Sequence, residues 1–357
     1  MRLTQEQDEL RSAVRSVLTQ HQADAAWAPL ATQIGATGLA VPEEYGGAGG
    51  GARDVHVLME ELGRSLSPLP CLGSSVLTVG ALLASGDEEA CGRLLPGLAE
   101  GTSVGTLAWA EQGSWDQEAV RAEAVAQPGG GRLITGTKEY VLDRPGVDVL
   151  VVAARTAHGV SLFEVAPDGA GVRREPVVTM DETRAQARWV LDGAEGRLLG
   201  ADGDGGRALE HVRDLACTAL AAEQVGAAER CLELTVAYAR TRVQFGRPIG
   251  SFQAVKHRLA DAYVLVESAR SAALGAAFAA DEDPGALPRA AAVAKSVCSE
   301  AFSAVAGEMI QLHGGIGITW EHDAHRYFKR AHGAGELFGP PSHHRARLAA
   351  GLGLAAR

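Results

Sequence analysis

The central part of the sequence is broken into short β-prone runs, and helical patterns flank it on both sides. The runs cover residues 104–109, 133–142, 147–154, 161–165, 171–178 and 187–191. Many short strands separated by turn residues are typical of an antiparallel barrel or sandwich. No long helical pattern intervenes, which disfavours a parallel doubly wound sheet. The sequence therefore predicts a mainly α protein with a central β-domain.

The N-terminal flank has the signals of several helices. Thr4 and Gln7 have the spacing of a capping box, and apolar residues then recur at helical spacing. Further helices are predicted at 54–63 and 74–85, and Asp87 is suited to cap the next one.

The C-terminal flank predicts a bundle, because its helical patterns are long and their connections are short. Residues 209–240 form either one very long helix or two, and further helices follow at 251–280, 288–312 and 343–352. The predicted domains are residues 1–100, 101–203 and 204–357.

Composition excludes several classes of protein. The formal net charge of −11 and the lack of a long basic run argue against a nucleic-acid partner. No stretch approaches the roughly 20 apolar residues of a membrane span, and the N-terminus lacks the apolar core of a signal peptide. The five cysteines are dispersed, as in reduced proteins without a zinc site: Cys71, Cys91, Cys217, Cys231 and Cys298. We therefore expect a soluble, cytoplasmic protein.

A turn joins two predicted helices between Arg242 and Gln253. Gly246, Pro248 and Gly250 interrupt the helical pattern there. An arginine at such a turn is well placed to bind a phosphate with two hydrogen bonds, and Phe245 offers a flat face for a ring. The alternative is an ordinary interhelical turn with a solvated arginine and a packed phenylalanine.

A second helix is predicted to stop at His313, Gly314 and Gly315. Glycines allow the backbone to approach another group closely. Gly315-Ile-Gly317 is not a dinucleotide fingerprint, because it follows a helix and not a strand. The alternative here is a simple helix C-cap.

These two turns, the loop from Pro42 to Gly47 and the α–β–α order together resemble the acyl-CoA dehydrogenase family, flavoproteins that desaturate acyl-CoA thioesters. The resemblance implies an N-terminal helical domain, a middle β-barrel and a C-terminal four-helix bundle. It implies FAD between the β-domain and the bundle, with part of the cofactor reaching a second subunit. It also implies an acyl-CoA substrate, an electron acceptor protein, and a homo- or hetero-oligomer.

The resemblance assigns cofactor contacts by position. Arg242 matches the arginine at the FAD pyrophosphate, and Gln253 matches the glutamine near the adenosine. The other residues matched to the two turns are Gln244, Phe245, Gln311, Gly314 and Gly315. In the β-domain, the matching segments are shorter or altered, and they leave Glu111, Ser114 and Tyr140 as flavin contacts, with Tyr140 shielding a flavin face. Leu142 stands where the family has a hydroxyl, so one hydrogen bond to the flavin is lost.

The catalytic base is missing at both positions where the family places it. One position holds Phe338, and the other holds Ala216 or Cys217. A carboxylate with a raised pKa is needed to remove the α-proton of the acyl group. Three interpretations follow. A sister subunit supplies the base, a shifted carboxylate (Glu336 or Asp214) acts, or the chain catalyses other flavin chemistry such as oxygenation.

The first interpretation is favoured, so the predicted function is FAD-dependent desaturation of an acyl-CoA together with a sister subunit. The alternatives are a non-catalytic structural subunit and a monooxygenase-like relative.

Other clusters carry weaker signals. His322 and His325 lack the paired Glu-x-x-His motifs of a di-iron bundle, so no metal site is predicted. His343 and His344 are expected at a solvated helix start. Three basic residues share one helical face, either exposed, at a subunit contact or near the phosphates of CoA: Arg326, Lys329 and Arg330. No Gly-x-Ser-x-Gly elbow is present, which excludes a common hydrolase class.

Overall fold

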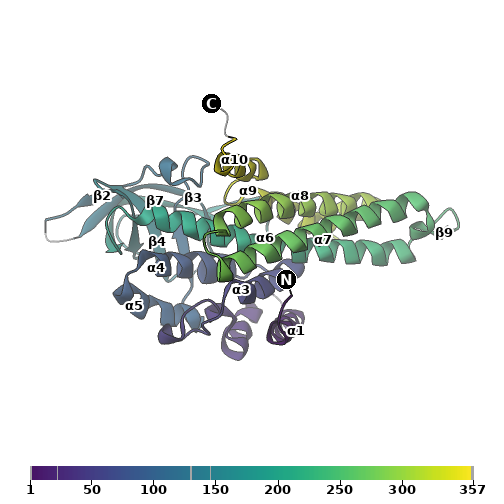
Figure 1. Cartoon of the computed structure of the whole chain (residues 1–357), viewed down its shortest axis with the longest axis horizontal. Helices are drawn as coiled ribbons and strands as arrows, with labels where there is room; N and C mark the ends of the chain where they lie inside the picture. Colours follow the sequence, from purple (N-terminus) through teal and green to yellow (C-terminus); the bar gives the residue numbers. More distant parts are fainter. Residues whose placement is uncertain (1, 22, 129–130, 145, 355–357) are drawn as a thin grey trace.

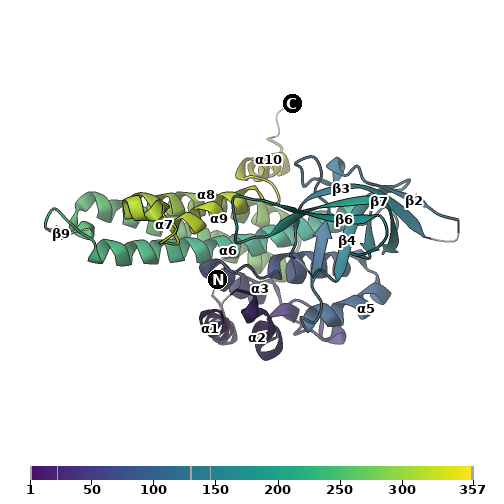
Figure 2. The same ribbon diagram turned by 180° about the vertical axis from the view of Figure 1, so that it is seen from behind.

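The computed structural model describes residues 2–21, 23–128, 131–144 and 146–354. A β-domain lies at one end of the molecule and a bundle of long helices extends to the other end (Figure 1). The N-terminal helices pack along one side of both parts, as the view from behind also shows (Figure 2). The β-prone runs were expected to be separated by turn residues that include Gly129, Gly130 and Gly131, and the first two of these lie outside the described residues. No helix within the described part of the chain is long and apolar enough to cross a membrane.

The predicted N-terminal helices are present. In α1 (Gln5–Gln20), the capping box forms as expected, with the Thr4 hydroxyl accepting from the Gln7 N–H at 3.3 Å. The helix capped by Asp87 is α5 (Glu88–Ala99), and the Asp87 carboxylate accepts from the Ala90 N–H at 2.9 Å. Helix α3 (Ala52–Arg64) packs on the bundle. The helix expected at 74–85 has two parts, a π-helical segment η5 (Leu72–Thr78) and α4 (Val79–Ser85).

Short helical turns complete this region: η1 (Ala23–Ala26), α2 (Trp27–Pro29), η2 (Leu30–Ile34), η3 (Ala36–Gly38) and η4 (Glu43–Tyr45).

The β-domain is a closed barrel. The pairings run from β4 through β2, β3, β7 and β5 back to β4, while β1 is added on β4 and β6 on β7. The strands are β1 (Gly105–Ala108), β2 (Glu123–Ala126), β3 (Arg132–Leu142), β4 (Val149–Thr156), β5 (Gly159–Val165), β6 (Val172–Val177) and β7 (Gln186–Leu199).

Two features of the barrel differ from the sequence prediction. Strand β2 was not predicted, because only one of its four residues is buried and its pattern is weak. The pairs β1–β4 and β2–β4 are parallel, so the sheet is mixed and not purely antiparallel. A short 3-10 turn, η6 (Gln117–Ala119), lies between β1 and β2.

The C-terminal region is the predicted bundle. Its first helix, α6 (Gly205–Thr241), is a single helix of 37 residues, which settles the alternative of one helix or two. The other helices are α7 (Gln253–Glu282), α8 (Leu287–His313), α9 (Ala324–Glu336) and α10 (Pro341–Gly351). The connections contain the small hairpin β8 (Val243–Gln244) and β9 (Arg247–Pro248), then η7 (Ile249–Ser251) and η8 (Gly314–Ile318).

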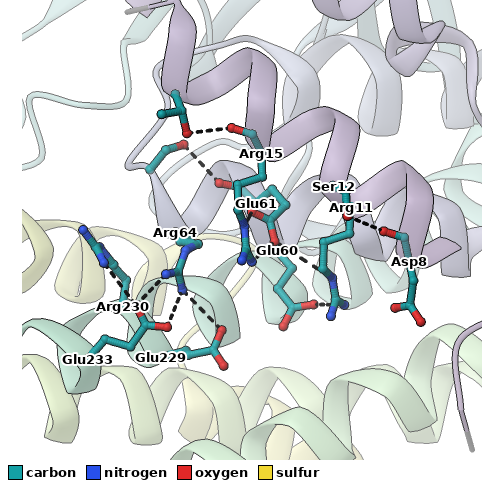
Figure 3. A network of polar contacts seen from close by, with 12 residues as sticks. Asp8, Arg11, Ser12, Arg15, Glu60, Glu61, Arg64, Glu229, Arg230 and Glu233 are labelled. Carbon is teal, nitrogen blue, oxygen red and sulfur yellow. Dashed lines mark hydrogen bonds and ion pairs between the residues drawn. The ribbon is translucent and has the colours of Figure 1, made fainter.

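An ion-pair network fixes the N-terminal helices to the bundle (Figure 3). The carboxylates of Glu60 and Glu61, both buried on α3, pair with Arg11 at 2.7 Å and Arg15 at 2.6 Å on α1. From the end of α3, Arg64 reaches Glu229 on α6 at 3.5 Å. Buried carboxylates are stable only when they are paired, so the contacts of Glu60 and Glu61 help to set where α1 lies on α3. The Arg64–Glu229 pair then joins α3 to α6.

Candidate functional site

The first predicted cofactor turn lies at the free tip of the bundle, in the hairpin between α6 and α7 (Figure 1). Arg242 caps the C-terminus of α6 in an extended conformation, and its side chain is exposed. Phe245 has a φ of 51° and is 92% exposed. The alternative of an ordinary turn is thus met in its solvated arginine but not in its packed phenylalanine. Gln244 and Gln253 are also exposed here.

The second predicted turn comes to the same end of the bundle. The Tyr238 hydroxyl, near the end of α6, donates to the His313 carbonyl at 3.4 Å, and the two rings stack 4.4 Å apart. Gly314 follows with a φ of 61° and a ψ of −140°, a conformation that favours glycine. A Cβ added at Gly314 or Gly315 would meet nothing within 4 Å among the described residues. The backbone at this turn is therefore open to an approaching group.

The predicted β-domain contacts lie elsewhere. The buried Glu111 carboxylate accepts from the backbone N–H groups of Arg121 at 2.8 Å and Ala122 at 3.0 Å, and it forms an ion pair with Lys138. Burial lowers the pKa of Lys138 to about 8. The Glu111 carboxylate is thus engaged inside the barrel, and its backbone N–H and carbonyl are hydrogen-bonded to Ser114 at 3.1 and 2.9 Å. Ser114 lies opposite Glu111 in an isolated β-bridge.

The two sets of predicted contacts lie at opposite ends of α6. The loop after β1 reaches α6 where Asp116 pairs with Arg213 at 2.9 Å. Arg242 lies 29 residues further along the helix. At 1.5 Å per residue, this separation is about 44 Å. The tip of the bundle and the β-domain of one chain therefore cannot both hold the same part of one cofactor.

Phe338, at the expected position of the catalytic base, is fully buried. It lies in the loop between α9 and α10 with a φ of 61°. Its ring lies parallel to the Trp109 ring, with centroids 5.8 Å apart, and edge-on to the Trp115 ring at 5.0 Å. Ala216 and Cys217, at the other expected position, are also fully buried. The structure therefore places aromatic and aliphatic groups where a base would be needed.

Trp115 also lies 6.1 Å from Tyr140, the residue expected to shield a flavin face. The side chains of Tyr140, Trp115, Phe338 and Trp109 thus form one continuous aromatic cluster. This aromatic cluster connects the predicted flavin-shielding residue, Tyr140, to the predicted base position at Phe338. Sequence reasoning did not identify Trp109 and Trp115 as site residues, although both are in or next to the altered segment that begins at Ala110.

Neither shifted carboxylate is in the environment that a base requires. Glu336 is exposed and lines an open cavity of about 380 Å³, together with Trp115, Tyr140 and His343. Asp214 is buried, but Arg347 donates to its carboxylate at 2.8 Å. A base for α-proton removal needs a dry site and an unpaired carboxylate that reaches the substrate.

His344 and Lys295 hold the loop that carries Phe338. His344 was expected at a solvated helix start but is fully buried, because its Nε2 contacts the Phe338 carbonyl at 3.0 Å and the Cys217 sulfur at 3.8 Å. The Lys295 ammonium donates to the carbonyls of Ala334 at 3.2 Å and Gly335 at 2.8 Å, which caps the end of α9. Lys295 was not identified from the sequence. A lysine on an alanine-rich helix face could have indicated a buried ammonium group that needs hydrogen-bond partners.

The contribution of His344 should make stability depend on pH. Burial lowers the pKa of His344 to about 3. Between that value and its ordinary pKa near 6.5, the unfolded chain takes up a proton that the folded chain does not. The advantage of wild type over His344→Gln in unfolding free energy should therefore be complete above pH 6.5 and fall on acidification, by at most about 1.4 kcal/mol per pH unit.

The measurement is urea unfolding at pH 7 and at pH 4.5, with His332→Gln, an exposed position on α9, as the control variant. A constant difference between wild type and His344→Gln at the two pH values would contradict the prediction.

The three basic residues predicted to share one face of α9 lie in different environments in the structure. Arg330 is 2% exposed and donates to Glu223 at 3.0 Å, Thr183 at 2.9 Å and the Ser67 carbonyl at 3.0 Å. It is therefore neither exposed nor free to bind the phosphates of CoA. Arg326 is exposed, and Lys329 lies over the Trp320 ring at 4.6 Å.

His322 and His325 do not share a helix, because α9 begins at Ala324. The His322 ring lies 4.3 Å from His313, and the His325 ring lies 4.6 Å from Trp320. Within the described ranges, no three His, Cys, Asp or Glu side chains lie close enough together to bind a metal ion. The five cysteines are all free and buried.

Comparison with known proteins gives consistent matches. The family profile for the acyl-CoA dehydrogenase C-terminal domain matches residues 203–353, and the profile for the N-terminal domain matches residues 4–102. Acyl-CoA dehydrogenase IpdE2 of Mycobacterium tuberculosis is 40% identical over 352 residues, which covers 94% of each chain.

Solved structures are similar over almost the whole chain. A structure described as the Tcur3481-Tcur3483 steroid ACAD G363A variant has 34% identity and a TM-score of 0.86, covering 98% of both chains. The ChsE4-ChsE5 complex from Mycobacterium tuberculosis has 30% identity and a TM-score of 0.89, covering 100% of this chain and 99% of the other.

Proposed function

Because the chain belongs to the acyl-CoA dehydrogenase family, we propose that it is the base-lacking subunit of a heteromeric enzyme, whose sister subunit supplies the catalytic glutamate. Members of this family are FAD-dependent oxidoreductases that act on CH–CH groups. In such an enzyme, this chain and its sister subunit would carry out that activity together.

The observation that carries the proposal is the buried Phe338. An aromatic ring cannot accept a proton, and Phe338 is held on Trp109 and Trp115 by close ring contacts. Phe338 and Trp109 are both fully buried, so moving these two side chains out of the packed core would cost free energy.

The residues of this chain fit the dinucleotide part of FAD but not its flavin ring. At the bundle tip, the exposed Arg242 guanidinium is suited to bind the pyrophosphate, and the open backbone at Gly314 and Gly315 allows close approach. At the other end, Leu142 lacks the hydroxyl that would bond the flavin ring. FAD, when bound, accepts the hydride from the acyl group. In this proposal, the chain binds and orients the dinucleotide part of FAD held by its sister subunit.

The comparisons support a two-chain assembly and a substrate class. Two similar structures are described as pairs of different proteins, and one is called a steroid ACAD. We therefore propose that the acyl group is derived from a steroid. An electron acceptor protein would then reoxidise the flavin, in the cytoplasm.

The test compares the full chain alone with the chain coexpressed with family members that carry glutamate at the position of Phe338. The chain alone should contain little flavin and should not oxidise acyl-CoA thioesters, steroid-derived ones included, with an artificial electron acceptor. Coexpression with the correct sister should give stoichiometric FAD and turnover.

Control variants locate the base. Glu336→Gln and Asp214→Asn in this chain should leave the rate of the complex within about twofold, whereas replacing the sister's glutamate by glutamine should lower it by at least about 10²-fold, the usual contribution of a general base. The proposal fails if the chain alone binds FAD stoichiometrically and turns over an acyl-CoA at a rate equal to the complex.

A further inference from the structure

A second cavity lies between the N-terminal helices and the bundle, and the proposed function does not use it. Its volume is about 200 Å³, and its walls come from the start of α3, the helix formed by η5 and α4, one face of α6, and the end of α7. Among the described residues that line it, none belongs to the aromatic cluster around Phe338. The cavity is therefore a separate feature of the fold.

The walls of this cavity are mostly apolar and small. Val76, Val79 and Leu83 form one side, and Leu215 and Ala219 face them from α6. Gly80 lies between these two sides, and a Cβ added there would meet only Val212 at 3.6 Å and Leu215 at 3.8 Å, which is ordinary contact. A larger side chain at Gly80 would therefore fill a space that is now hollow. For comparison, a dry cavity of roughly 150 Å³ is large enough to hold benzene.

The Ser75 side chain places a buried hydroxyl at this mostly apolar site. Ser75 lines the cavity, and its hydroxyl oxygen is buried with no hydrogen-bond partner in the described part of the chain. A buried hydroxyl that makes no hydrogen bond is unfavourable, so such groups usually have a partner in the functional state.

Ser75 also belongs to the π-helical segment η5. Within η5, the Thr78 hydroxyl bonds the Gly73 carbonyl at 2.8 Å, five residues back, as the wider turn allows. π-helical turns are rare and are found frequently at functional sites.

Three other polar side chains line the wall, and they differ from Ser75. Asp281 already accepts from the Ala52 N–H at 2.6 Å and from the Arg53 side chain at 2.7 Å, Thr218 donates to the Asp214 carbonyl at 2.9 Å, and His211 is exposed to solvent. Among the described residues of this wall, the Ser75 hydroxyl is thus the buried side-chain group that has no hydrogen-bond partner.

We infer that this cavity binds a small aliphatic or alicyclic molecule that carries one hydroxyl or carbonyl oxygen. The hydrocarbon part lies against the valine and leucine side chains, and the oxygen forms a hydrogen bond with the Ser75 hydroxyl. The inference is independent of the proposed function, because it uses none of the residues assigned to FAD or to the missing base.

The test measures binding of cyclohexanol and of methylcyclohexane to the full-length chain by ligand-detected NMR. Wild type should bind both saturably at one site. Ser75→Ala should weaken cyclohexanol binding about fivefold, the usual effect of one hydrogen bond, and leave methylcyclohexane binding unchanged. Gly80→Leu should abolish binding of both molecules.

Gly92→Leu is the matched control, because Gly92 lies in α5 with nothing within 4 Å of an added Cβ. Circular dichroism checks that each variant is folded, and Ala52→Leu fills the cavity from α3 if Gly80→Leu does not fold. Absence of saturable binding by wild type, or binding unaffected by both cavity-filling variants, would overturn the inference. An unchanged cyclohexanol affinity in Ser75→Ala would overturn the role of the hydroxyl.

Discussion

Replacing Arg242 with alanine should remove most of the FAD from the complex of this chain with its sister subunit, while the chain itself stays folded. Arg242 lies at the tip of the bundle, and its side chain is exposed. Its loss therefore removes no contact that the fold needs. A charge-assisted hydrogen bond contributes about 1.5–3 kcal/mol, so FAD affinity should fall by roughly 10- to 150-fold. The measurement is the flavin absorbance per complex after gel filtration, together with titration by FAD.

Arg240→Ala is the control, since it removes the same charge from an exposed position two residues earlier on α6. This control should retain FAD at the wild-type level. If both variants lose FAD equally, net charge at the tip and not a specific contact holds the cofactor. If neither variant loses FAD, Arg242 does not bind the pyrophosphate, and the assignment of the bundle tip fails.

Replacing Glu223 with alanine should destabilise the chain strongly. Glu223 lies on α6 with 3% exposure, and it forms ion pairs with two buried arginines, Arg184 from the loop before β7 and Arg330 from α9. Its removal leaves two guanidinium groups in the interior, and in the described part of the chain their remaining ion-pair partner is Asp181, 3.5 Å from Arg330. Breaking a buried ion pair costs about 3–5 kcal/mol, a large fraction of the roughly 5–15 kcal/mol that stabilises a folded protein.

The measurement is urea unfolding followed by circular dichroism. Glu300→Ala is the control, because Glu300 pairs with Arg345 at the surface, and both side chains are more than half exposed. Such surface pairs contribute about 0–1 kcal/mol. Equal destabilisation by the two variants would mean that the buried network adds nothing beyond a surface pair.

Local patterns in the sequence predicted much of the fold. The capping box at Thr4 and the cap at Asp87 form as expected, because both depend only on residues within one helical turn. The barrel was predicted from its turns and strands, but the unburied strand β2 and its parallel pairing with β4 were not. Parallel pairing joins residues far apart in the sequence, and no local pattern encodes it. The limits of the three domains stay a prediction.

In the candidate site, too, the local features were predictable from the sequence and the contacts between remote residues were not. The turns at Arg242 and Gly314 were recognised because several glycine and proline residues close together usually end a helix. The absence of a carboxylate at Phe338 and at Ala216 was also evident from the sequence. The environments of single side chains were not predictable, and those of His344 and Arg330 were predicted wrongly. Their burial depends on partners from other elements, namely the Phe338 carbonyl for His344 and Glu223 for Arg330.

By itself, the sequence determined that the chain has the helices, barrel and glycine turns of its family and lacks the usual base, since these properties are local. Only the tertiary structure decided that Trp109 and Trp115 close the base position around Phe338, and that the two groups of predicted cofactor residues lie about 44 Å apart along α6. The physical reason is that packing and distance depend on how remote segments meet. A rigid helix of 37 residues holds its two ends apart, whatever motifs they carry.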